Sequence, residues 1–456
     1  MNASVIAIGD ELVSGHIVDT NSAWLSNALG DIGINVVGHR CVPDRVELIA
    51  EQLQQCAQVA DVLVVTGGLG PTADDVTRAG LAWAMGEELM EDGAAFEEIV
   101  ARYAARGIRI PDENRVQALR PASAVIIPNP DGTAPGLQAW LGAAGGAAVF
   151  VMPGVPAEMT SMWHRSVVPA IREMRQAKGG GDGDVESAEQ VIVTQLVRCI
   201  GVPESRVGKL LRDLMERGAN PTVGTLPQDS VVTCRVRGVG AAGVIEPQVE
   251  AVAAEIERRL GSHVLGRGMV TPAEAIVKRL TAGGLTLVTA ESCTGGLVGA
   301  ALTSVPGSSA CYAGGWQTYS NEMKIDCLGV DVQTLREHGA VSGLVADQMV
   351  LGALEKSGAD LGLAITGVAG PDGGTEHKPV GTVYIALGVV DEDGKPSTMV
   401  RRFAFPAGAD PVRSRESVRQ RATTAALGMC FLHLVSDVGE LPGWLTWEHR
   451  PAVESG

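Results

Sequence analysis

The chain has few aromatic residues and no excess of positive charge. Aromatic residues make up 4% of its 456 residues, and 36 Lys and Arg stand against 53 Asp and Glu, a net charge of −17. An acidic chain of this kind does not attract nucleic acid or anionic membranes non-specifically. The eight cysteines form no CxxC pair and no metal-ligand cluster with histidine, which argues against a disulfide framework and indicates reduced thiols.

Long apolar runs are missing as well. No segment approaches the length of a membrane span, and Met1–Leu12 has no basic stretch followed by a long apolar run. We therefore expect a soluble, cytoplasmic protein with no membrane partner. The charge balance gives the same expectation for nucleic acid, so small molecules are the expected partners.

Glycine, by contrast, is abundant, with 58 residues. Together with the length, this predicts two or three α/β domains with many tight strand-to-helix turns. The Gly-rich segment Lys178–Asp184 predicts a linker. Thr271, Pro272 and Glu274 form a capping-box pattern that opens a further domain. The expected domains are residues 1–177, 185–264 and 270–436.

Short apolar runs alternate with helical patterns in the first domain, which predicts parallel βαβ units with functional loops at the strand ends. The strands are expected at 4–8, 35–42, 62–66 and 148–152, and the helices at 21–32, 46–57 and 157–175. The central part predicts a small α+β module with strands at 190–199 and 230–237 and helices at 204–216 and 247–260. The last domain predicts strands at 285–289, 361–366 and 382–389 and a final helix at 417–434.

The segment Thr289–Gly296, TAESCTGG, follows an apolar run and predicts a strand that turns sharply into a helix at 297–302. The first N–H groups of that helix would point back at Ser292 and Thr294 and offer an anion or oxyanion site. Ser292 is then placed to be a nucleophile. Two alternatives stay open: Ser292 only caps the helix, or the neighbouring Cys293 is the nucleophile, although buried cysteines are commonly inert.

A serine nucleophile needs a base. Lys324, in the segment Thr318–Lys324, is the candidate if burial lowers its pKa enough to leave it neutral. Ser320 or Asn321 would cap the helix that carries it, and Tyr319 would relay a proton or orient the substrate. A third segment, the glycine-rich loop 366–374, follows an apolar strand. Histidines lie far from these segments in sequence and would reach them only through the fold: His338, His377 and His433.

A second glycine-rich loop lies near the other end of the chain. Gly67, Gly68 and Gly70 follow the strand at 62–66 and would let the backbone approach a phosphate closely, with exposed N–H groups forming an anion nest. The adjacent carboxylates of Asp74 and Asp75 suit a divalent cation that bridges to phosphate oxygens. The alternative is that one of the two caps a helix that starts near residue 76.

Five segments of the last domain, TAESCTGG, TYSNEMK, HGAVS, TGVAGPDGG and KPVGTVY, together resemble the C-terminal domain of the CinA family, the nicotinamide mononucleotide deamidases. The resemblance implies that Ser292 attacks the carboxamide, with Lys324 as general base and Tyr319 assisting, to give nicotinic acid mononucleotide and ammonia without a cofactor. It implies that Arg415 contacts the phosphate and that Arg419 is structural. The substrate-binding residues that it implies are Thr294, Gly295, Gly296, Thr366, Gly367, Ala369, Gly370 and Arg415.

The segments around Gly9–Leu12, Asp19–Asn21 and Thr66–Asp75 resemble the molybdopterin-binding domain of molybdenum cofactor biosynthesis proteins. They resemble more closely the N-terminal domain of the CinA family, which implies hydrolysis of ADP-ribose with a divalent metal ion, Mg²⁺ or a transition metal. The nucleotide-binding residues are then expected to be Gly67, Gly68, Gly70, Thr72 and Asn114. The metal ligands are expected to be Asp74, Asp75, Asp10 and Glu11, with Glu158 as a further contact.

The central module resembles the KH-like domain of the same family, but no GxxG loop of the kind that clamps nucleic acid follows its helix. We expect it to serve assembly, as a homodimer. The leading hypothesis is therefore a pyridine-nucleotide salvage enzyme with two activities. The alternatives are a molybdopterin- or nucleotide-binding protein of the molybdenum-cofactor type and a non-catalytic, competence-related binding protein.

Overall fold

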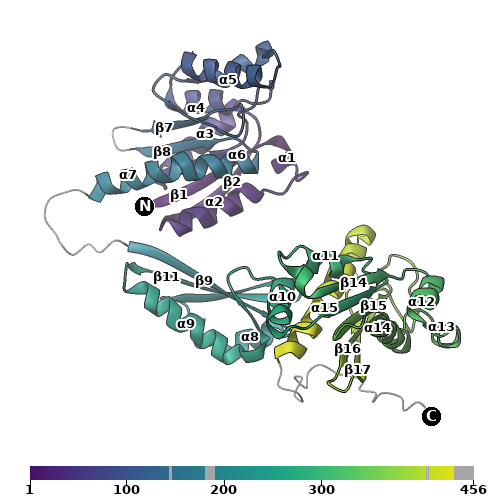
Figure 1. Cartoon of the computed structure of the whole chain (residues 1–456). Coiled ribbons are helices and arrows are strands. Elements are labelled where there is room, and N and C mark those ends of the chain that lie inside the picture. The colour runs from purple at the N-terminus through teal and green to yellow at the C-terminus, as the bar shows by residue number, and fades with distance from the viewer. Residues whose placement is uncertain (143–145, 180–189, 407, 409, 436–456) are drawn as a thin grey trace. The chain divides into compact units, whose positions relative to one another are not determined.

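The computed structural model describes residues 1–142, 146–179, 190–406, 408 and 410–435, which fall into two compact units (Figure 1). The first unit comprises residues 1–194 with 238–247, and the second comprises 195–237 with 248–456. The first two residues of the expected linker 178–184, Lys178 and Gly179, are the last residues of helix α7 (Val168–Gly179). Residues 180–184 lie outside the described residues. The segment after residue 435 also lies outside them.

The first unit is built on a six-stranded sheet with the order β2-β1-β3-β8-β7-β6. The first four strands pair in parallel and the last two antiparallel. The strands are β1 (Asn2–Ile8), β2 (Asn35–Val42), β3 (Val62–Thr66), β6 (Val125–Ile127), β7 (Gly136–Leu141) and β8 (Ala147–Met152). Every residue of β3 and β8 is buried, as expected for parallel strands that are covered on both faces.

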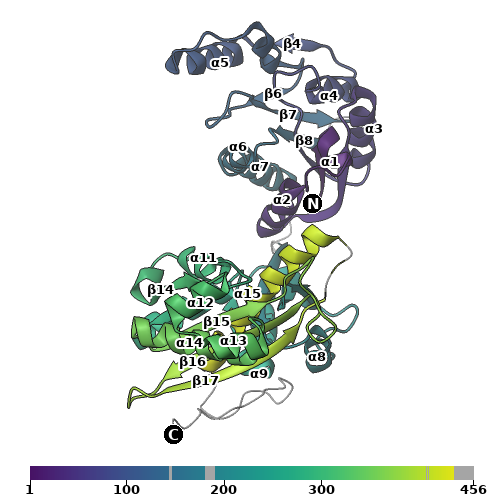
Figure 2. The same ribbon diagram turned by 90° about the vertical axis from the view of Figure 1, so that its right-hand side faces the viewer.

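Helices cover both faces of this sheet (Figure 2). Leu53 and Leu81 pack on one face, from α3 and α4. On the other face Leu25 and Trp163 pack with the α7 residue Ile171. The helices of the unit are α1 (Asp10–Val13), α2 (Thr20–Asp31), α3 (Val46–Ala57), α4 (Thr77–Met85), α5 (Gly93–Ala105), α6 (Pro156–Met162) and α7. The expected helix 157–175 is thus α6 and α7, joined by a π-helical turn at Trp163–Val167. A short ribbon of β4 (Leu89–Glu91) and β5 (Leu119–Pro121) completes the unit.

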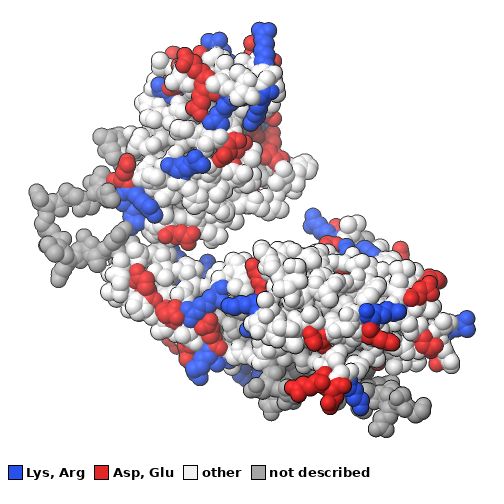
Figure 3. Space-filling view, viewed as in Figure 1, with Lys and Arg blue, Asp and Glu red and all other residues white. Residues whose placement is uncertain are grey.

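The KH-like module has a four-stranded sheet with the order β10-β11-β9-β12. Its elements are β9 (Gln190–Ile200), α8 (Glu204–Leu210), β10 (Thr222–Gln228), β11 (Val231–Ala241), α9 (Ile245–Leu260) and β12 (Val264–Arg267). The sequence did not predict β10 and β12, and α8 is shorter than the expected helix 204–216. In Figure 3, acidic and basic side chains are interspersed over the visible face of the described residues, with ion pairs such as Arg258–Glu255 (2.6 Å) on α9.

The last domain holds a five-stranded sheet with the order β14-β13-β15-β16-β17. Strands β14, β13 and β15 run parallel, and β16 and β17 are antiparallel additions. The strands are β13 (Leu287–Glu291), β14 (Tyr312–Gln317), β15 (Leu361–Gly367), β16 (Thr382–Val390) and β17 (Pro396–Ala404). The expected capping box is confirmed: Glu274 N–H donates to Thr271 Oγ1 (3.2 Å) and Thr271 N–H to Glu274 Oε2 (2.6 Å).

Helices flank this sheet too. Met349 and Val350 of α14 pack on one face, and Val418 and Phe431 of α15 with Ile276 of α10 pack on the other. The helices are α10 (Pro272–Gly283), α11 (Leu297–Thr303), α12 (Asn321–Leu328), α13 (Val332–His338), α14 (Gly343–Ser357) and α15 (Pro411–Val435). Among the described residues no helix is both long and apolar enough to cross a membrane. The parallel strands β13 and β15 end side by side, and their carboxyl ends position the site described next.

Candidate functional site

Ser292 and Lys324 meet at the end of β13. Ser292 follows the last residue of the strand, and its N–H donates to the carbonyl of Ile365 on β15 (3.0 Å), which fixes the start of the turn. Lys324 Nζ lies 3.1 Å from Ser292 Oγ. Both side chains are buried. The serine and the amine that the sequence singled out are therefore within direct proton-transfer distance.

Lys324 is held in an unusual environment for an amine. It is 0% exposed, and its Nζ donates to the carbonyls of Thr318 (2.8 Å) and Tyr319 (3.3 Å). Ser320 caps α12 through the N–H of Met323 (3.2 Å), so the helix presents Lys324 from its first turn. Burial lowers the pKa of Lys324, and only the nearby Cys293 thiol opposes that shift. A neutral amine is the form that accepts a proton from serine.

A cavity of about 190 Å³ opens at this pair. The structure brings Tyr319, Thr366, Gly367, Ala369 and Arg415 to it. It is lined by Ser292, Cys293, Tyr319, Lys324, Ala340, Val341, Thr366, Gly367, Ala369 and Arg415. No histidine belongs to this lining, and the expected contacts Thr294, Gly295, Gly296 and Gly370 do not belong to it either.

The expected oxyanion site at the start of α11 is wrong, because Glu291 occupies it. This last residue of β13 is 0% exposed. Its Oε2 accepts from Gly296 N–H (2.9 Å) and Val298 N–H (3.2 Å), and its Oε1 accepts from Gly299 N–H (2.9 Å). The N–H of Gly295 is also used, since it donates to Ser292 O (3.1 Å). The glycines therefore shape the turn, and its N–H groups bind a carboxylate of the chain itself.

Cys293, the rival nucleophile, is a poor candidate in this environment. Its side chain is buried, and burial raises the pKa of its thiol to about 12. The thiol therefore stays protonated at neutral pH, whereas the thiolate is the reactive form. Among the hydrogen bonds of the described residues, none joins the Cys293 thiol to a base, whereas Ser292 Oγ lies 3.1 Å from Lys324 Nζ.

Tyr319 and Arg415 lie at the mouth of the cavity. Tyr319 is 65% exposed, and its hydroxyl accepts from Arg415 Nη2 (3.1 Å). Arg415 Nη1 donates to the carbonyl of Gly370, so Gly370 positions the arginine from outside the lining. Arg419, one turn further along α15, donates to Thr294 O (3.0 Å) and pairs with Glu416 (2.9 Å). Its contacts are those of a structural residue.

The glycine-rich loop of the first unit forms one wall of a second cavity, of about 650 Å³. Gly67 and Gly68 have positive φ values of 105° and 62°. A Cβ on Gly67 would lie 2.1 Å from Ile8 O, and a Cβ on Gly68 would lie 2.1 Å from Thr77 Oγ1. Only glycine fits at both positions. The expected residues that line this cavity are Gly67, Gly68, Gly70, Thr72, Glu11, Asp74, Asp75 and Glu158.

Acidic side chains gather beside this loop, and one of them was missed by the sequence analysis. Asp44 follows β2 and lines the cavity. Its Oδ2 accepts from Asp10 N–H (2.8 Å), and its own N–H donates to Asp10 Oδ1 (3.2 Å). Burial raises the pKa of Asp44, and the charges of Asp10, Glu11 and Asp74 raise it further. The carboxylates of Asp10, Glu11 and Asp74 are therefore close enough to act on that of Asp44.

Asp74 and Asp75 differ in their surroundings. Asp75 Oδ2 accepts from Thr72 N–H (2.9 Å) and from the Thr72 hydroxyl, which braces the loop. Neither carboxylate caps α4, whose N-cap is Val76, so that alternative is wrong. Within the described residues no group of three or more His, Cys, Asp or Glu side chains is arranged to hold a metal ion.

Asn114 does not line this cavity. It is buried, and its Nδ2 donates to Tyr103 Oη (2.9 Å) and Gln117 Oε1 (2.9 Å). Gln117 does line the cavity, so Asn114 positions a residue that the sequence analysis overlooked. Asn21 also lines it, and its Nδ2 joins α2 to Gly154 O (2.8 Å) across the strand ends.

Comparison with known proteins matches all three parts of the chain. Three family models match: the CinA C-terminal domain at residues 270–434, a probable molybdopterin binding domain at 4–173, and the damage-inducible protein CinA KH domain at 194–266. A CinA-like protein of Shewanella loihica is 39% identical over 434 residues, 94% of this chain and 95% of that protein. A CinA-like protein of Citrifermentans bemidjiense is 39% identical over 415 residues, 91% of this chain and 94% of that protein.

Among solved structures, competence/damage inducible protein CihA from Agrobacterium tumefaciens is 41% identical. It covers 35% of this chain and 90% of its own, with a TM-score of 0.32.

The folds and sites define a multidomain α/β protein with a molybdopterin-binding-like domain, a KH-like module and a C-terminal domain that carries a serine–lysine pair. Similarity over nearly the full length of its relatives fixes the family. The chain belongs to the CinA family.

Proposed function

We propose that the C-terminal domain hydrolyses the carboxamide of nicotinamide mononucleotide to nicotinic acid mononucleotide and ammonia. The observation that carries this proposal is the 3.1 Å separation of Ser292 Oγ from the Nζ of a fully buried Lys324. A binding protein needs neither a nucleophile nor a desolvated amine beside it. The small cavity suits the carboxamide ring, which leaves the phosphate of the nucleotide at the mouth, where Arg415 lies.

In the first step Lys324 Nζ accepts the proton of Ser292 Oγ–H while Oγ forms a bond to the carboxamide carbon. The C–N bond then breaks, and ammonia leaves with the proton that Lys324 returns to it. A water molecule attacks the resulting ester, Lys324 takes a proton from the water, and the ester bond to Ser292 breaks. Nicotinic acid mononucleotide is released, and Ser292 regains its proton from Lys324.

The remaining pocket residues bind and orient the substrate. Arg415 pairs with the phosphate, and a guanidinium is suited to that role because it offers two parallel N–H donors. Tyr319, which already accepts from Arg415, orients the arginine and the ribose at the mouth. Thr366 is buried at the end of β15 and donates through its hydroxyl to Ala340 O (2.7 Å), so it joins two walls of the cavity.

The test is ammonia release from nicotinamide mononucleotide in the presence of a metal chelator. We expect release by the parent protein and by Cys293→Ala, and no release by Ser292→Ala. Release that survives in Ser292→Ala but is lost in Cys293→Ala would reassign the nucleophile. No release by a well-folded parent protein would leave this domain with a binding role, which is the competence-related alternative.

A second function is favoured by the acidic cavity of the first unit: hydrolysis of ADP-ribose at its diphosphate. A cavity of about 650 Å³ lies within the size range of nucleotide-sized ligand sites. Glu11, Asp44 and Asp74 line this cavity and Asp10 does not, and among the described residues these carboxylates are not arranged as a ready-made metal site. In this proposal a divalent cation would arrive with the diphosphate and neutralise part of its charge, and the carboxylates that line the cavity would offer it hard oxygen ligands while Asp75 braces the loop.

The protein's own residues prepare this site. In this proposal the N–H groups of Gly68, Leu69 and Gly70 bind a phosphate, because the N–H of Gly67 is already donated to Met152 O (3.0 Å). Asn21 and Glu158 line the same cavity. The test is cleavage of ADP-ribose with and without added Mg²⁺ or a transition metal. Tight binding of a molybdopterin without cleavage of ADP-ribose would instead favour the molybdenum-cofactor alternative.

A further inference from the structure

The glycine-rich loop of the first unit is held from behind by the start of α4. The carbonyl of Gly67 accepts from the Thr77 hydroxyl (2.9 Å), and the carbonyl of Gly68 accepts from the Thr77 N–H (3.3 Å). The carbonyl of Leu69 accepts from Arg78 Nη2 (2.9 Å). Three consecutive carbonyls of the loop are therefore bound by the first two residues of this helix.

This arrangement turns the opposite edges of the same three peptides away from α4. The peptides are trans, and in a trans peptide the N–H points away from the C=O. The N–H groups concerned belong to Gly68, Leu69 and Gly70, which all line the cavity of about 650 Å³. Among the described residues none of these three N–H groups donates to a backbone carbonyl. Together they form a nest of donors that suits an anion.

The side chains of the cavity do not supply the positive charge that an anion needs. Within the described residues its lining contains no Lys, Arg or His. Its charged residues are all acidic: Glu11, Asp19, Asp44, Asp74, Asp75 and Glu158. These carboxylates would repel a phosphate on the loop unless positive charge lay close to it. A bound cation would supply part of that charge, and the protein itself supplies more from behind the loop.

That charge belongs to Arg78, which is 3% exposed. Burial lowers the pKa of Arg78 to about 10, and the charge of Asp75 opposes the shift, so the guanidinium is positive at neutral pH. Its Nε and Nη1 have no hydrogen-bond partner among the described residues. Asp75 accepts from Thr72 N–H (2.9 Å) instead. A buried charge without a bound counter-ion is costly, and a negative group on the loop would offset that cost.

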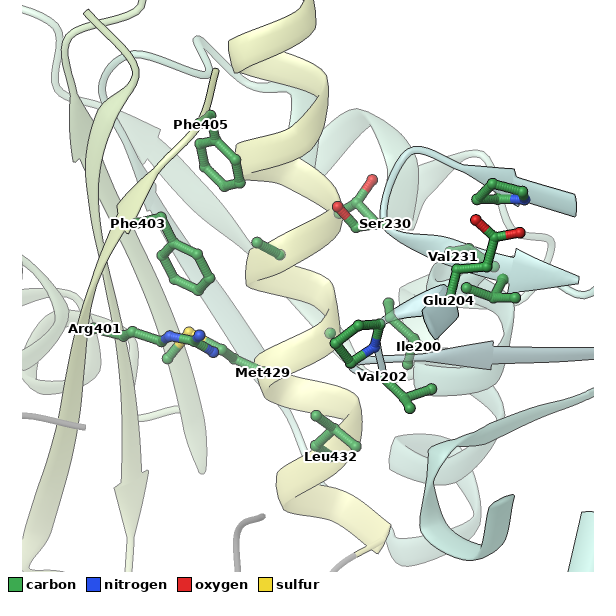
Figure 4. Close-up of a pocket in the computed structure, with 17 residues that line it drawn as sticks. Ile200, Val202, Glu204, Ser230, Val231, Arg401, Phe403, Phe405, Met429 and Leu432 are labelled. Carbon is green, nitrogen blue, oxygen red and sulfur yellow. The ribbon is translucent and has the colours of Figure 1, made fainter. Parts of the chain in front are cut away.

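Arg401 of the second unit is a buried arginine of the contrasting kind. Figure 4 shows it on β17 beside Phe403, at a cavity with many apolar lining residues. Its guanidinium lies 4.4 Å from the centre of the Phe403 ring, a contact that partly replaces the water lost on burial. In the part of the chain that the structure describes, no ring lies over Arg78 in this way. The hydrogen bond of Arg78 goes to the loop.

We propose that Arg78 is the positioning residue and the buried counter-charge for a phosphate group bound by the three N–H groups of this loop. It acts through Leu69, whose carbonyl it holds on the side away from the cavity. The Leu69 side chain is 1% exposed and packs in the core, so this peptide is fixed from both sides. This role rests on the phosphate-binding function proposed for the first unit, and it explains how an acidic cavity accepts a phosphate.

The test compares adenosine monophosphate with adenosine, which differ by one phosphate, by isothermal titration calorimetry on the full chain with a metal chelator. Every chain carries Arg415→Leu, which removes the other proposed phosphate contact. We expect the monophosphate to bind about tenfold more tightly than adenosine. Arg78→Met should remove most of that preference without changing the affinity for adenosine, and Arg78→Lys, which keeps the charge, should retain most of it. Arg106→Met is the matched control, since Arg106 is exposed at the end of α5 and does not line the cavity.

Thermal unfolding separates this role from a purely structural one. Methionine is unbranched and apolar, so Arg78→Met removes a buried charge without leaving a large cavity. We expect its unfolding midpoint to equal or exceed that of the parent, although the preference for the phosphate is lost. A lower midpoint together with an unchanged preference would show a purely structural arginine and overturn the proposal.

Two further results would each overturn it: a parent chain that binds the monophosphate no more tightly than adenosine, or a folded Arg78→Lys that has lost the preference. Failure of the proposed hydrolysis is a separate outcome. A chain that does not cleave ADP-ribose but shows the preference and its dependence on Arg78 would refute the hydrolysis and support the role of Arg78, because binding of the monophosphate needs no cleavage.

Discussion

The buried carboxylate of Glu291 should determine the shape of the turn that carries the nucleophile. Ser292 is the next residue, and three N–H groups of the following turn and helix converge on this carboxylate. Glu291→Gln keeps the size of the side chain and replaces one acceptor oxygen by an NH₂ group. The substitution therefore tests the hydrogen bonds without creating a cavity.

The magnitude follows from counting partners. Oε2 accepts two N–H groups and Oε1 accepts one, from Gly299. If the amide oxygen of glutamine takes the Oε2 position, the Gly299 N–H faces an NH₂ group and loses its acceptor. An unsatisfied buried donor costs about 1–3 kcal/mol, and the two remaining bonds lose their charge assistance, so we expect a total loss of about 2–4 kcal/mol in local stability. A turn displaced by ~1 Å at the nucleophile would lower turnover on the order of 100-fold.

Two measurements check this prediction. Native-state hydrogen exchange at the Gly296, Val298 and Gly299 amides should become faster in Glu291→Gln, because it reports the opening of the turn directly. Ammonia release should fall in kcat more than it changes in KM. Glu355→Gln, on the exposed side of α14, is the control and should change neither. Unaltered exchange and unaltered kcat in Glu291→Gln would show that the carboxylate does not hold the turn, and the reasoning would be refuted.

Three further predictions follow from the same structure. Lys324→Met should lower deamidation by roughly 10²–10⁴-fold with substrate affinity retained. Because burial lowers the pKa of Lys324 in the folded protein, the unfolded chain binds more protons at this residue than the folded one. The unfolding free energy of the parent should therefore rise relative to that of Lys324→Met as the pH increases towards ~10.4. A flat difference across that pH range, in denaturant titrations, would contradict a depressed pKa. Arg415→Leu should raise KM for nicotinamide mononucleotide roughly tenfold or more with kcat nearly kept, whereas the exposed Arg413→Leu should not. Asp44→Asn should reduce metal-stimulated cleavage of ADP-ribose and spare ammonia release, since asparagine can still accept from Asp10 N–H; equal loss of both activities would indicate misfolding.

The local sequence pattern correctly predicted a strand that is buried along its whole length and a helix with one apolar face. The expected strand 62–66 and helix 46–57 are confirmed to the residue as β3 and α3, because a fully apolar run and a helical period leave little choice. The strand β14 (Tyr312–Gln317) was missed. Its sequence, YAGGWQ, has one alanine and two glycines in the middle, which are residues depleted in strands. It forms a strand because β13 offers it a parallel edge, which is a tertiary cause that no local window contains.

The residues of the candidate sites also fall into those that the sequence predicted and those that it missed. The side chains of Ser292 and Lys324 lie 32 positions apart in the chain, and the sequence named both from their residue types and their segments. The prediction of an oxyanion site at the start of α11 was wrong, because the sequence does not distinguish a free helix N-terminus from one whose N–H groups bind a buried glutamate. Asp44, in contrast, lies two residues after the end of β2, and strand ends were the signal used for the other acidic residues. That signal could have found it.

The choice of lysine as the base follows from where the fold puts it. An exposed lysine is protonated at neutral pH and cannot accept a proton from serine. The fold removes Lys324 from water completely, and this disfavours the charged form. The carbonyls of Thr318 and Tyr319 bind its two N–H groups and aim the remaining lone pair at Ser292 once the amine is neutral. The amine is therefore held by the short segment Thr318–Tyr319, which joins β14 to the N-cap of α12. Substitutions in that segment should therefore affect catalysis through the pKa of Lys324, even where they touch no substrate atom.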